Sequence, residues 1–286
     1  MTATRLVKIS PIRTVINVVA KRLAGRESVG EASRVEGFDA AQSFQGDTAE
    51  HNDDRPRGDE AETLALLSEF APGRALELTI GSGRIALPIA SAGIRVDGIE
   101  LSPDMISGLQ RRAADLEVTV GALEGDMTTI HTGKRYPLVF LIFNTIFNLL
   151  TQDNQIRCFE NAAHHLDPDG VFLIETDVPS AWTSAYSYVN AENITPTSVE
   201  LDVCKYDPIT QIFDENHVRL DAAGAHFRPI SCRLAWPAEL DLMARLAGLR
   251  LRTLGWLEAR TLLRRQQAPR LDLRPVAATE RCCASK

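Results

Sequence analysis

The sequence predicts an α/β fold with a doubly wound parallel sheet, followed by an antiparallel β insertion. Short apolar runs alternate with helix-like segments between residues 59 and 178, and β-like stretches replace that alternation over 198–235. Alternation of strands and helices favours a parallel sheet with helices on both faces. The chain has 286 residues, 44% of them hydrophobic, which is enough for one large domain.

The first 55 residues predict a poorly ordered basic and polar segment, because their second half is rich in Gly, Ser and charge. Helix periodicity begins near Asp59, so we place the main domain over residues 56–255. In order, we expect strands over 74–80, 94–100, 116–123, 136–143 and 171–175, and helices over 83–92, after Ser102 and over 152–166. Ser102 can cap its helix, with Pro103 at the first position. The run 136–143 is almost entirely apolar, as a central strand should be.

The pattern changes after Val178. The stretches SVELDVCKY, QIFDENHVRL and HFRPISCRLAW predict an antiparallel insertion over 178–236, which we interpret as a substrate lid. Pro237 then opens a helix, and LRLRTLG reads as a sixth strand.

Charge and cysteine content narrow the function classes. The net charge is -7, but residues 1–35 carry +5 and residues 250–286 carry +6, which leaves -18 for the segment between them. An acidic body argues against nucleic acid as a partner. There is no apolar run of membrane-spanning length. The five cysteines are an odd number without zinc-ligand spacing, so we expect reduced thiols, a cytoplasmic location and no metal site.

Candidate ligand-binding residues follow the first three strands, where parallel sheets bind ligands. Gly81 and Gly83 let the backbone approach a ligand closely, and the carboxylate of Glu77 suits an ammonium or sulfonium group. Glu100, after the second strand, can accept both hydroxyls of a ribose. After the third strand, Asp126 can accept from an adenine amino group and Met127 can pack on the ring. Each motif alone also fits a simple turn or helix cap.

Together these motifs resemble a known family. ALELTIGSGRIALPIA, GIELSPDMI, EGDM and LVFLIFNTIFNLLTQDNQ are similar to class I S-adenosylmethionine-dependent methyltransferases, in a small-molecule branch common in actinobacteria. The resemblance implies a Rossmann-like sheet and S-adenosyl-L-methionine as cofactor. It implies that Glu77, Gly81 and Gly83 hold the methionine part, that Glu100 holds the ribose, and that Leu101 lies beside the adenine. Asp126 and Met127 would contact the adenine, and Phe143 would line the methyl-donor pocket.

The chain departs from the family pattern at both ends of the domain. Thr79 replaces the first motif glycine, which can weaken cofactor binding. The family sheet ends with an antiparallel seventh strand between strands five and six. No alternating apolar run follows Leu254, so residues 256–286 read as an atypical basic tail. On this interpretation the antiparallel seventh strand can be missing. A frameshift after about Leu254 would explain this departure.

No catalytic residue is assigned from the sequence. Asn148 stands where some relatives carry a His, so no imidazole base is expected there. Asn144 and Asn148 can orient a substrate or cap the next helix. Glu175 and Asp177 end the fifth strand and can bind an amine or act as a base. Tyr206 and Trp236 can wall the substrate site or simply pack.

The sequence therefore predicts methyl transfer to a small-molecule O or N acceptor, with the oligomeric state left open. A degenerate relative that no longer catalyses is one alternative, favoured by Thr79 and by the tail. A nicotinamide-dependent oxidoreductase is another, because Gly81, Gly83 and Ala86 nearly satisfy G-x-G-x-x-A.

Overall fold

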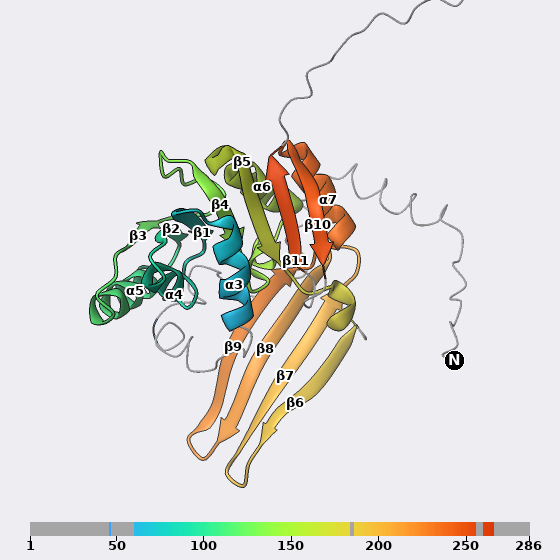
Figure 1. Ribbon diagram of the computed structural model, residues 1–286. Helices are drawn as coiled ribbons and strands as arrows, with labels where there is room; N and C mark the ends of the chain where they lie inside the picture. The colour runs from blue at the N-terminus through green and yellow to red at the C-terminus, as the bar shows by residue number, and fades with distance from the viewer. Residues whose placement is uncertain (1–45, 47–59, 184–185, 256–259, 266–286) are drawn as a thin grey trace, which may run out of the picture.

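A seven-stranded sheet forms the centre of the protein. The computed structural model describes residues 46, 60–183, 186–255 and 260–265. The strands of the central sheet are β1 (Arg74–Leu78), β2 (Arg95–Glu100), β3 (Val120–Glu124), β4 (Tyr136–Leu141), β5 (Leu166–Glu175), β10 (Leu249–Gly255) and β11 (Arg260–Arg265). Their spatial order is β10-β11-β5-β4-β1-β2-β3, in which β1 to β5 pair in parallel. The predicted doubly wound sheet is confirmed (Figure 1).

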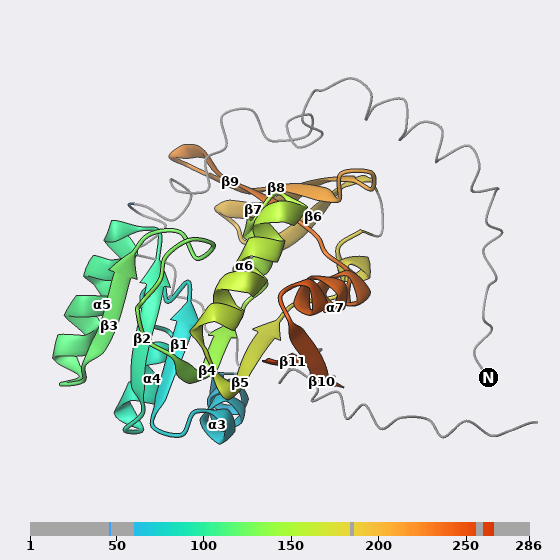
Figure 2. The same cartoon turned by 90° about the horizontal axis from the view of Figure 1, so that it is seen from above.

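Helices cover both faces of this sheet, as Figure 2 shows. The helices are α3 (Glu60–Phe70), α4 (Ala86–Ser91), α5 (Pro103–Asp115), α6 (Gln152–His165) and α7 (Pro237–Leu246), with short 3-10 helices η1 (Thr145–Asn148) and η2 (Pro179–Ala181). The helices α3, α4 and α5 lie on one face, and α6 and α7 lie on the other. Each face therefore has its own apolar core.

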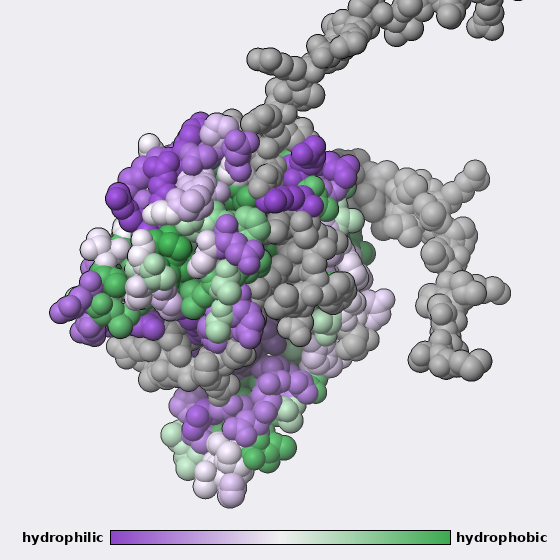
Figure 3. All heavy atoms as spheres, viewed as in Figure 1, coloured by the Kyte–Doolittle hydropathy of each residue, from purple (hydrophilic) through white to green (hydrophobic). Residues whose placement is uncertain are grey.

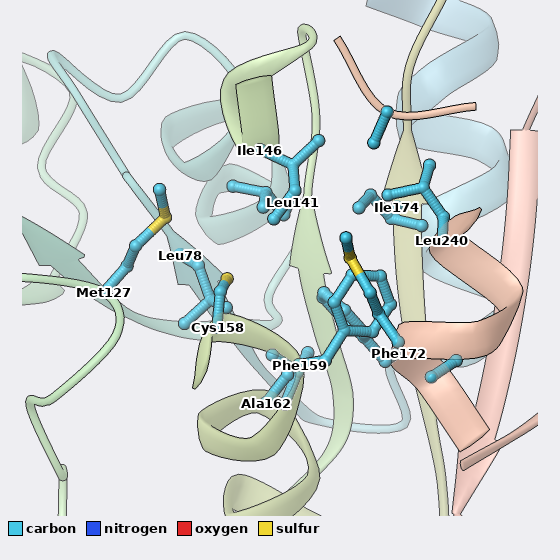
Figure 4. Close-up of a cluster of buried hydrophobic side chains, with 14 of the residues drawn as sticks. Leu78, Met127, Leu141, Ile146, Cys158, Phe159, Ala162, Phe172, Ile174 and Leu240 are labelled. Carbon is cyan, nitrogen blue, oxygen red and sulfur yellow. The ribbon is translucent and has the colours of Figure 1, made fainter. Parts of the chain in front are cut away.

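The alternation of side chains along β1 decides which core each residue joins. Leu76 and Leu78 belong to the core under α6, where Phe159, Phe172 and Leu240 also pack (Figure 4). Ala75 belongs to the core under α3 and α4. Because neighbouring strand residues point to opposite faces, Glu77 lies on the α3–α4 face, among apolar neighbours.

Two side chains cap helices at the edge of the sheet where the parallel strands end. Ser102 Oγ accepts from Met105 N at 3.3 Å, with Pro103 as the first residue of α5. Thr151 Oγ1 accepts from Asn154 N at 3.1 Å and caps α6. The prediction that Ser102 caps its helix is confirmed. The two caps fix where α5 and α6 begin after the loops that precede them.

A second sheet follows η2 and projects from the central domain (Figure 1). It is an antiparallel meander of β6 (Ser187–Ile194), β7 (Ser198–Asp207), β8 (Ile212–Asp221) and β9 (Gly224–Arg233). Its base joins the main core through Cys204, Phe213 and Cys232. The predicted antiparallel insertion is confirmed.

The prediction that the last strand is missing is wrong. Residues Arg260–Arg265 form β11, which pairs antiparallel with both β5 and β10. The segment RTLLRR lacks the alternation of a strand exposed on one face. A strand buried on both faces is usually a continuous apolar run, and a segment with three arginines in six residues is not one, so β11 is defined by its pairing with β5 and β10 rather than by its own residues. The rest of the predicted tail and the predicted N-terminal segment 1–55, apart from Gly46, lie outside the described residues.

Two element boundaries also differ from expectation. The third strand begins at Val120 rather than 116, because Glu117 has a left-handed φ of 54° that places it in a turn. The fifth strand begins at Leu166 rather than 171, and its pairing with β4 is irregular over residues 167–170, because Tyr136 pairs with Leu166 and Leu138 pairs with Val171. Among the described residues, the structure contains no helix long and apolar enough to cross a membrane.

Candidate active site

The first part of the candidate site is the loop between β1 and α4. Thr79 has a φ of 70°, and both its backbone N–H and that of Ile80 donate to Ile99 O. A left-handed φ is costly for a β-branched residue, so this position favours the glycine that the family pattern has there. The strain is held in place by the pairing of this loop with the end of β2.

Gly81 and Gly83 have different reasons to be glycine. A Cβ on Gly83 would lie 2.4 Å from Leu109 Cδ1 and 2.8 Å from Leu87 Cγ, so this glycine lets α4 and α5 pack closely. A Cβ on Gly81 would meet nothing within 4 Å. Gly81 therefore presents bare backbone to open space, as close approach of a ligand requires.

Glu100 is positioned by the backbone at the end of β2. Its Oε2 accepts from Gly81 N and its Oε1 accepts from Ser102 N, each at 2.8 Å. These N–H groups lower the pKa of Glu100, but burial outweighs them and the pKa is raised. Each carboxylate oxygen has a second lone pair, so a diol can still be bound.

Glu77 is a buried carboxylate without a complete set of partners. It is 3% exposed, and its Oε2 has no hydrogen-bond partner among the described residues. Burial, and then the neighbouring charge of Glu100, raise the pKa of Glu77 well above its usual value. A cation bound beside Glu77 would relieve both effects.

The segment after β3 combines a turn with core packing. Asp126 Oδ1 accepts from Thr128 N at 2.7 Å, and Oδ2 makes no hydrogen bond to the described residues. The turn interpretation of Asp126 is thus correct, and one oxygen remains for a ligand. Met127 is 7% exposed and packs in the main core near Leu78 and Cys158 (Figure 4). Leu101 is 44% exposed beside Glu100.

These residues fit the cofactor that the resemblance implies. S-adenosyl-L-methionine has a sulfonium and an ammonium group, a ribose diol and an adenine. The partner-deficient carboxylate of Glu77, the open backbone of Gly81 and the oriented carboxylate of Glu100 offer complementary groups on adjacent parallel strands.

The end of β4 carries two successive non-glycine residues with positive φ, namely Phe143 at 60° and Asn144 at 63°. Phe143 N donates to Glu175 Oε2 at 3.5 Å, and the guanidinium of Arg84 lies 5.5 Å from the centre of the Phe143 ring. Consecutive strained residues are concentrated at functional sites. This turn places Phe143 between the cofactor loop and the end of β5.

Asn144 and Asp177 brace one another. Asn144 Nδ2 donates to Asp177 Oδ2 at 2.9 Å, while Asp177 N donates to Asn144 Oδ1. Glu175 and Asp177 therefore both turn toward the end of β4, and Asp177 is exposed. The helix-capping alternative for Asn144 and Asn148 is wrong, because Thr151 caps α6. Asn148 Oδ1 instead accepts from the Cys232 thiol at 3.7 Å.

An aromatic group missed by the sequence analysis links the central sheet to the second sheet. The Trp182 ring lies 5.9 Å from Phe147 and 5.8 Å from Phe213, and Tyr188 Oη donates to Trp182 O at 3.0 Å. The sequence did not indicate this aromatic group, because its rings come from η1, η2 and β8, which are far apart along the chain. Tyr206 packs against the same core, whereas Trp236 is 42% exposed before α7.

An acidic cluster lies beyond these aromatic rings on β7 and β8. His217 Nδ1 lies 2.6 Å from Asp202 Oδ1, and His217 Nε2 lies 3.8 Å from Glu215 Oε2. Burial raises the pKa of Glu215, although the charge of His217 opposes that rise. These residues share the face of the second sheet that carries Cys204 and Phe213 at its base.

Comparisons with known proteins agree with this geometry. A family model described as a methyltransferase domain matches residues 75–170. Over 117 residues the chain is 32% identical to dTDP-3-amino-3,6-dideoxy-alpha-D-glucopyranose N,N-dimethyltransferase of Streptomyces fradiae, a match that covers 40% of this chain and 44% of that protein. It is 26% identical to the cypemycin N-terminal methyltransferase of a Streptomyces species, covering 65% and 77% respectively.

A solved structure extends the likeness to most of the chain. The CcbJ methyltransferase of Streptomyces caelestis is 30% identical, with a TM-score of 0.74, and the match covers 80% of this chain and all of that one. The relatives named here are all methyltransferases, so the comparisons give the oxidoreductase alternative no support. The chain belongs to the class I S-adenosylmethionine-dependent methyltransferases.

Proposed function

We propose that this protein transfers the methyl group of S-adenosyl-L-methionine to an amine nitrogen of a small-molecule acceptor. The observation that carries the proposal is Glu77, a buried carboxylate whose Oε2 has no partner, next to the oriented carboxylate of Glu100. Buried carboxylates are normally paired. A cationic ligand with a diol is the kind of molecule that would satisfy both groups.

The proposed cofactor contacts follow from the placement of each residue. Glu77 and the backbone of Gly81 would hold the charged methionine part, and Glu100 would accept from the ribose hydroxyls. Asp126 Oδ2 would accept from the adenine amino group, with Leu101 beside the ring. Gly83 and Thr79 would shape the loop, and the exposed part of Met127 would border the adenine.

When bound, the cofactor would supply a methyl group on a positively charged sulfur. Transfer to the acceptor would form an N–C bond as the C–S bond breaks, and the nitrogen would then lose a proton. The chain's task is to hold that nitrogen in line and to receive the proton. Phe143 would border the transferring methyl, opposite the guanidinium of Arg84.

An amine is favoured over a hydroxyl because the nearby side chains are carboxylates. Asp177 is fixed by its two hydrogen bonds with Asn144, and we propose that its carboxylate binds the acceptor amine and takes its proton. Glu175 supports the same turn through Phe143 N. Of the relatives named above, one is titled an N,N-dimethyltransferase and another an N-terminal methyltransferase.

Acceptor selectivity would come from the second sheet. Trp182 and Phe213 would form an apolar wall, and Glu215 with Asp202 would favour a cationic group further out. Asn148, Tyr206 and Trp236 lie around the base of this sheet and are proposed as border residues. We propose a cytoplasmic location as well, supported by the three described cysteines, which are free thiols.

The proposal is tested by incubating the protein with S-adenosyl-L-methionine and a panel of amino sugars, short peptides and matched alcohols. Mass spectrometry should detect a 14 Da gain on amines only. Asp177→Asn should lower kcat/KM by about 100-fold, in the range expected for loss of a proton acceptor. The control Asp169→Asn removes a carboxylate at the far end of β5 and should retain full activity. Equal methylation of amines and alcohols would refute the acceptor assignment.

A degenerate protein that binds cofactor without turnover is the second candidate function. The φ of 70° at Thr79 favours it, because that strain lies in the cofactor loop itself. Cofactor binding without methylation of any amine or alcohol in the panel, in a protein that unfolds cooperatively, would support this second function.

A further inference from the structure

The outer face of the β6–β9 sheet is apolar over its projecting half. We call this surface the outer apolar face. It comprises Val189, Ala191, Ile194, Val199, Leu201, Val203, Val218, Leu220, Ala225, Phe227 and Pro229. Their cross-strand pairing places them on one side of the sheet, as in Val189↔Val203 and Val218↔Phe227. The polar side chain of Asn216 lies on the same side, between Val203 and Pro229, and Lys205 and Asp214 form the next row toward the base of the sheet.

Seven of these eleven side chains are exposed, and Val199, Leu201, Val218 and Pro229 are half-buried. The exposed fraction is 72% for Ile194, 63% for Phe227, 61% for Val189, 43% for Val203 and 41% for Leu220. Green side chains are visible at the free end of this sheet, at the bottom of Figure 3. Single exposed apolar residues are common, but a contiguous set on a regular sheet is not.

The polarity of this sheet is the reverse of the usual arrangement. Its other face joins the main core at the base, through Cys204 and Phe213. Further out, that same face carries polar and charged contacts, including His217 Nδ1 to Asp202 Oδ1 at 2.6 Å and the Arg219–Glu200 ion pair at 3.6 Å. A sheet that served only its own domain would place apolar side chains toward the domain and charges toward water. Here the apolar side chains face away from the domain.

We propose that the outer apolar face binds the same face of a second copy of this chain. With roughly 150–200 Å² for a fully exposed large apolar residue, the five residues whose exposed fractions are given offer about 420–560 Å², and the other six residues of the face add to this area. The face therefore approaches the roughly 800 Å² per partner of a stable interface and lies at or above the upper end of the largest apolar patches of typical monomers, about 300–600 Å². The area is thus close to what a dimer needs.

A second copy suits this face better than a different partner. A flat antiparallel sheet is self-complementary about a two-fold axis, because its strands run in both directions. The charges nearest to the outer apolar face are Lys205 and Asp214, which are register partners of opposite sign, so the face offers an unlike partner no excess charge. Sheet-on-sheet packing of two such faces would create an ordinary β-sandwich core.

The proposal is tested by sedimentation velocity of the full chain at about 1 to 100 µM. The wild type should sediment as a dimer. Val203→Lys and Phe227→Lys should each raise the dimer dissociation constant by about 10- to 100-fold, because each would bury a charge in the interface. Asn193→Lys adds the same charge on the opposite face of the same sheet and should leave the dimer intact.

Thermal unfolding of each variant separates lost association from lost folding. A variant that is monomeric and still unfolds cooperatively supports the proposal. A monomeric wild type at 100 µM overturns it, whatever else covers the face. A dimer that persists in the double variant Val203→Lys/Phe227→Lys also overturns it, because the contact would then lie elsewhere.

Discussion

At the scale of single residues, Glu77 is placed where it destabilises the free protein when ionised and where it is proposed to bind the cofactor. Glu77 has a raised pKa because it is buried beside Glu100. In such a group the folded state holds its proton to higher pH than the unfolded state. Its contribution to stability is therefore present below the unfolded pKa and is lost as pH rises through the folded pKa. The free protein therefore becomes less stable as pH rises through the folded pKa of Glu77, because the buried carboxyl then loses its proton beside Glu100.

Replacing the Glu77 carboxylate with its neutral isostere tests both effects on stability and on cofactor binding. We expect Glu77→Gln to raise the stability of the free protein by about 1–3 kcal/mol at a pH above the folded pKa of Glu77, because an amide cannot carry the charge that burial penalises. The same variant should lose affinity for S-adenosyl-L-methionine. Thermal unfolding with and without cofactor measures both effects. A variant that is less stable yet binds normally would show that Glu77 is a structural residue.

The φ of Thr79 leads to a second prediction at this scale. Thr79→Gly should raise the Tm by about 2–4 °C, because relief of left-handed strain exceeds the entropy cost of glycine by about 1 kcal/mol. Thr128→Gly, at a turn with ordinary φ, should lower the Tm instead. An unchanged or lower Tm for Thr79→Gly would mean that the loop accommodates threonine without strain.

Sequence reasoning located these residues well and their partners poorly. Glu77, Gly81, Glu100 and Asp126 follow successive strands, and strand order alone brings them to one edge of a parallel sheet. The brace between Asn144 and Asp177 was not predicted, because it depends on two consecutive left-handed residues after β4. A left-handed φ is not predictable from the sequence at Phe143 and Asn144, because neither residue is glycine.

At the scale of elements, α6 is anchored by a buried neutral histidine. His165 Nε2 accepts from Thr132 N at 3.0 Å, and Nδ1 lies 2.9 Å from Asn161 O. Nδ1 must therefore carry the proton and Nε2 must be bare. Burial lowers the pKa of His165, and the nearby His164 and His131 lower it further.

This anchor predicts acid sensitivity. Below about pH 6.5 the unfolded imidazole takes up a proton that the folded one resists, so stability falls as pH falls. One such group changes stability by at most about 1.4 kcal/mol per pH unit. The Tm of the wild type should drop between pH 7 and pH 5, and His165→Gln should flatten that drop. The control His164→Gln alters an exposed ring and should keep it. Equal slopes in all three proteins would exclude this anchor as the cause.

The central position of β11 leads to a prediction for chains truncated at the C-terminus. A chain ending after Gly255 leaves β5 and β10 with unpaired edges in the middle of the sheet, which costs about 1–3 kcal/mol for each buried group left unpaired. We expect this chain to be insoluble or to lack a cooperative transition. A chain ending after Arg265 retains β11 and should keep the wild-type Tm. Equal stability of the two truncated chains would show that β11 adds nothing.

The strands that the sequence predicted best are those with the clearest pattern. Residues 136–141 are apolar on both faces because β4 is central, and the alternation of 198–205 fits a strand with two unlike faces. The strand β11 escaped prediction because it too is central, but it is short and rich in arginine. Its pairing with β5 and β10 comes from the topology of the whole sheet rather than from its own residues.

At the scale of the whole molecule, the two sheets carry different groups of candidate residues. The central sheet gathers the cofactor candidates at one edge, and the second sheet presents an aromatic wall and an acidic cluster toward it. The outer side of the second sheet is apolar and suits a second copy. The sequence predicted the insertion, but it did not predict which of its faces would meet the domain.

The measurement that tests the central claim most directly is calorimetric titration of the full chain with S-adenosylhomocysteine. We predict binding with a Kd on the order of micromolar, weakened by about 10- to 100-fold in Glu100→Ala, as loss of hydrogen bonds to a charged group would cause. Glu124→Ala is the matched control, because Glu124 is the exposed register partner of Glu100 on β3. Absence of binding by the folded wild type, or equal binding by Glu100→Ala, would contradict the proposed cofactor site.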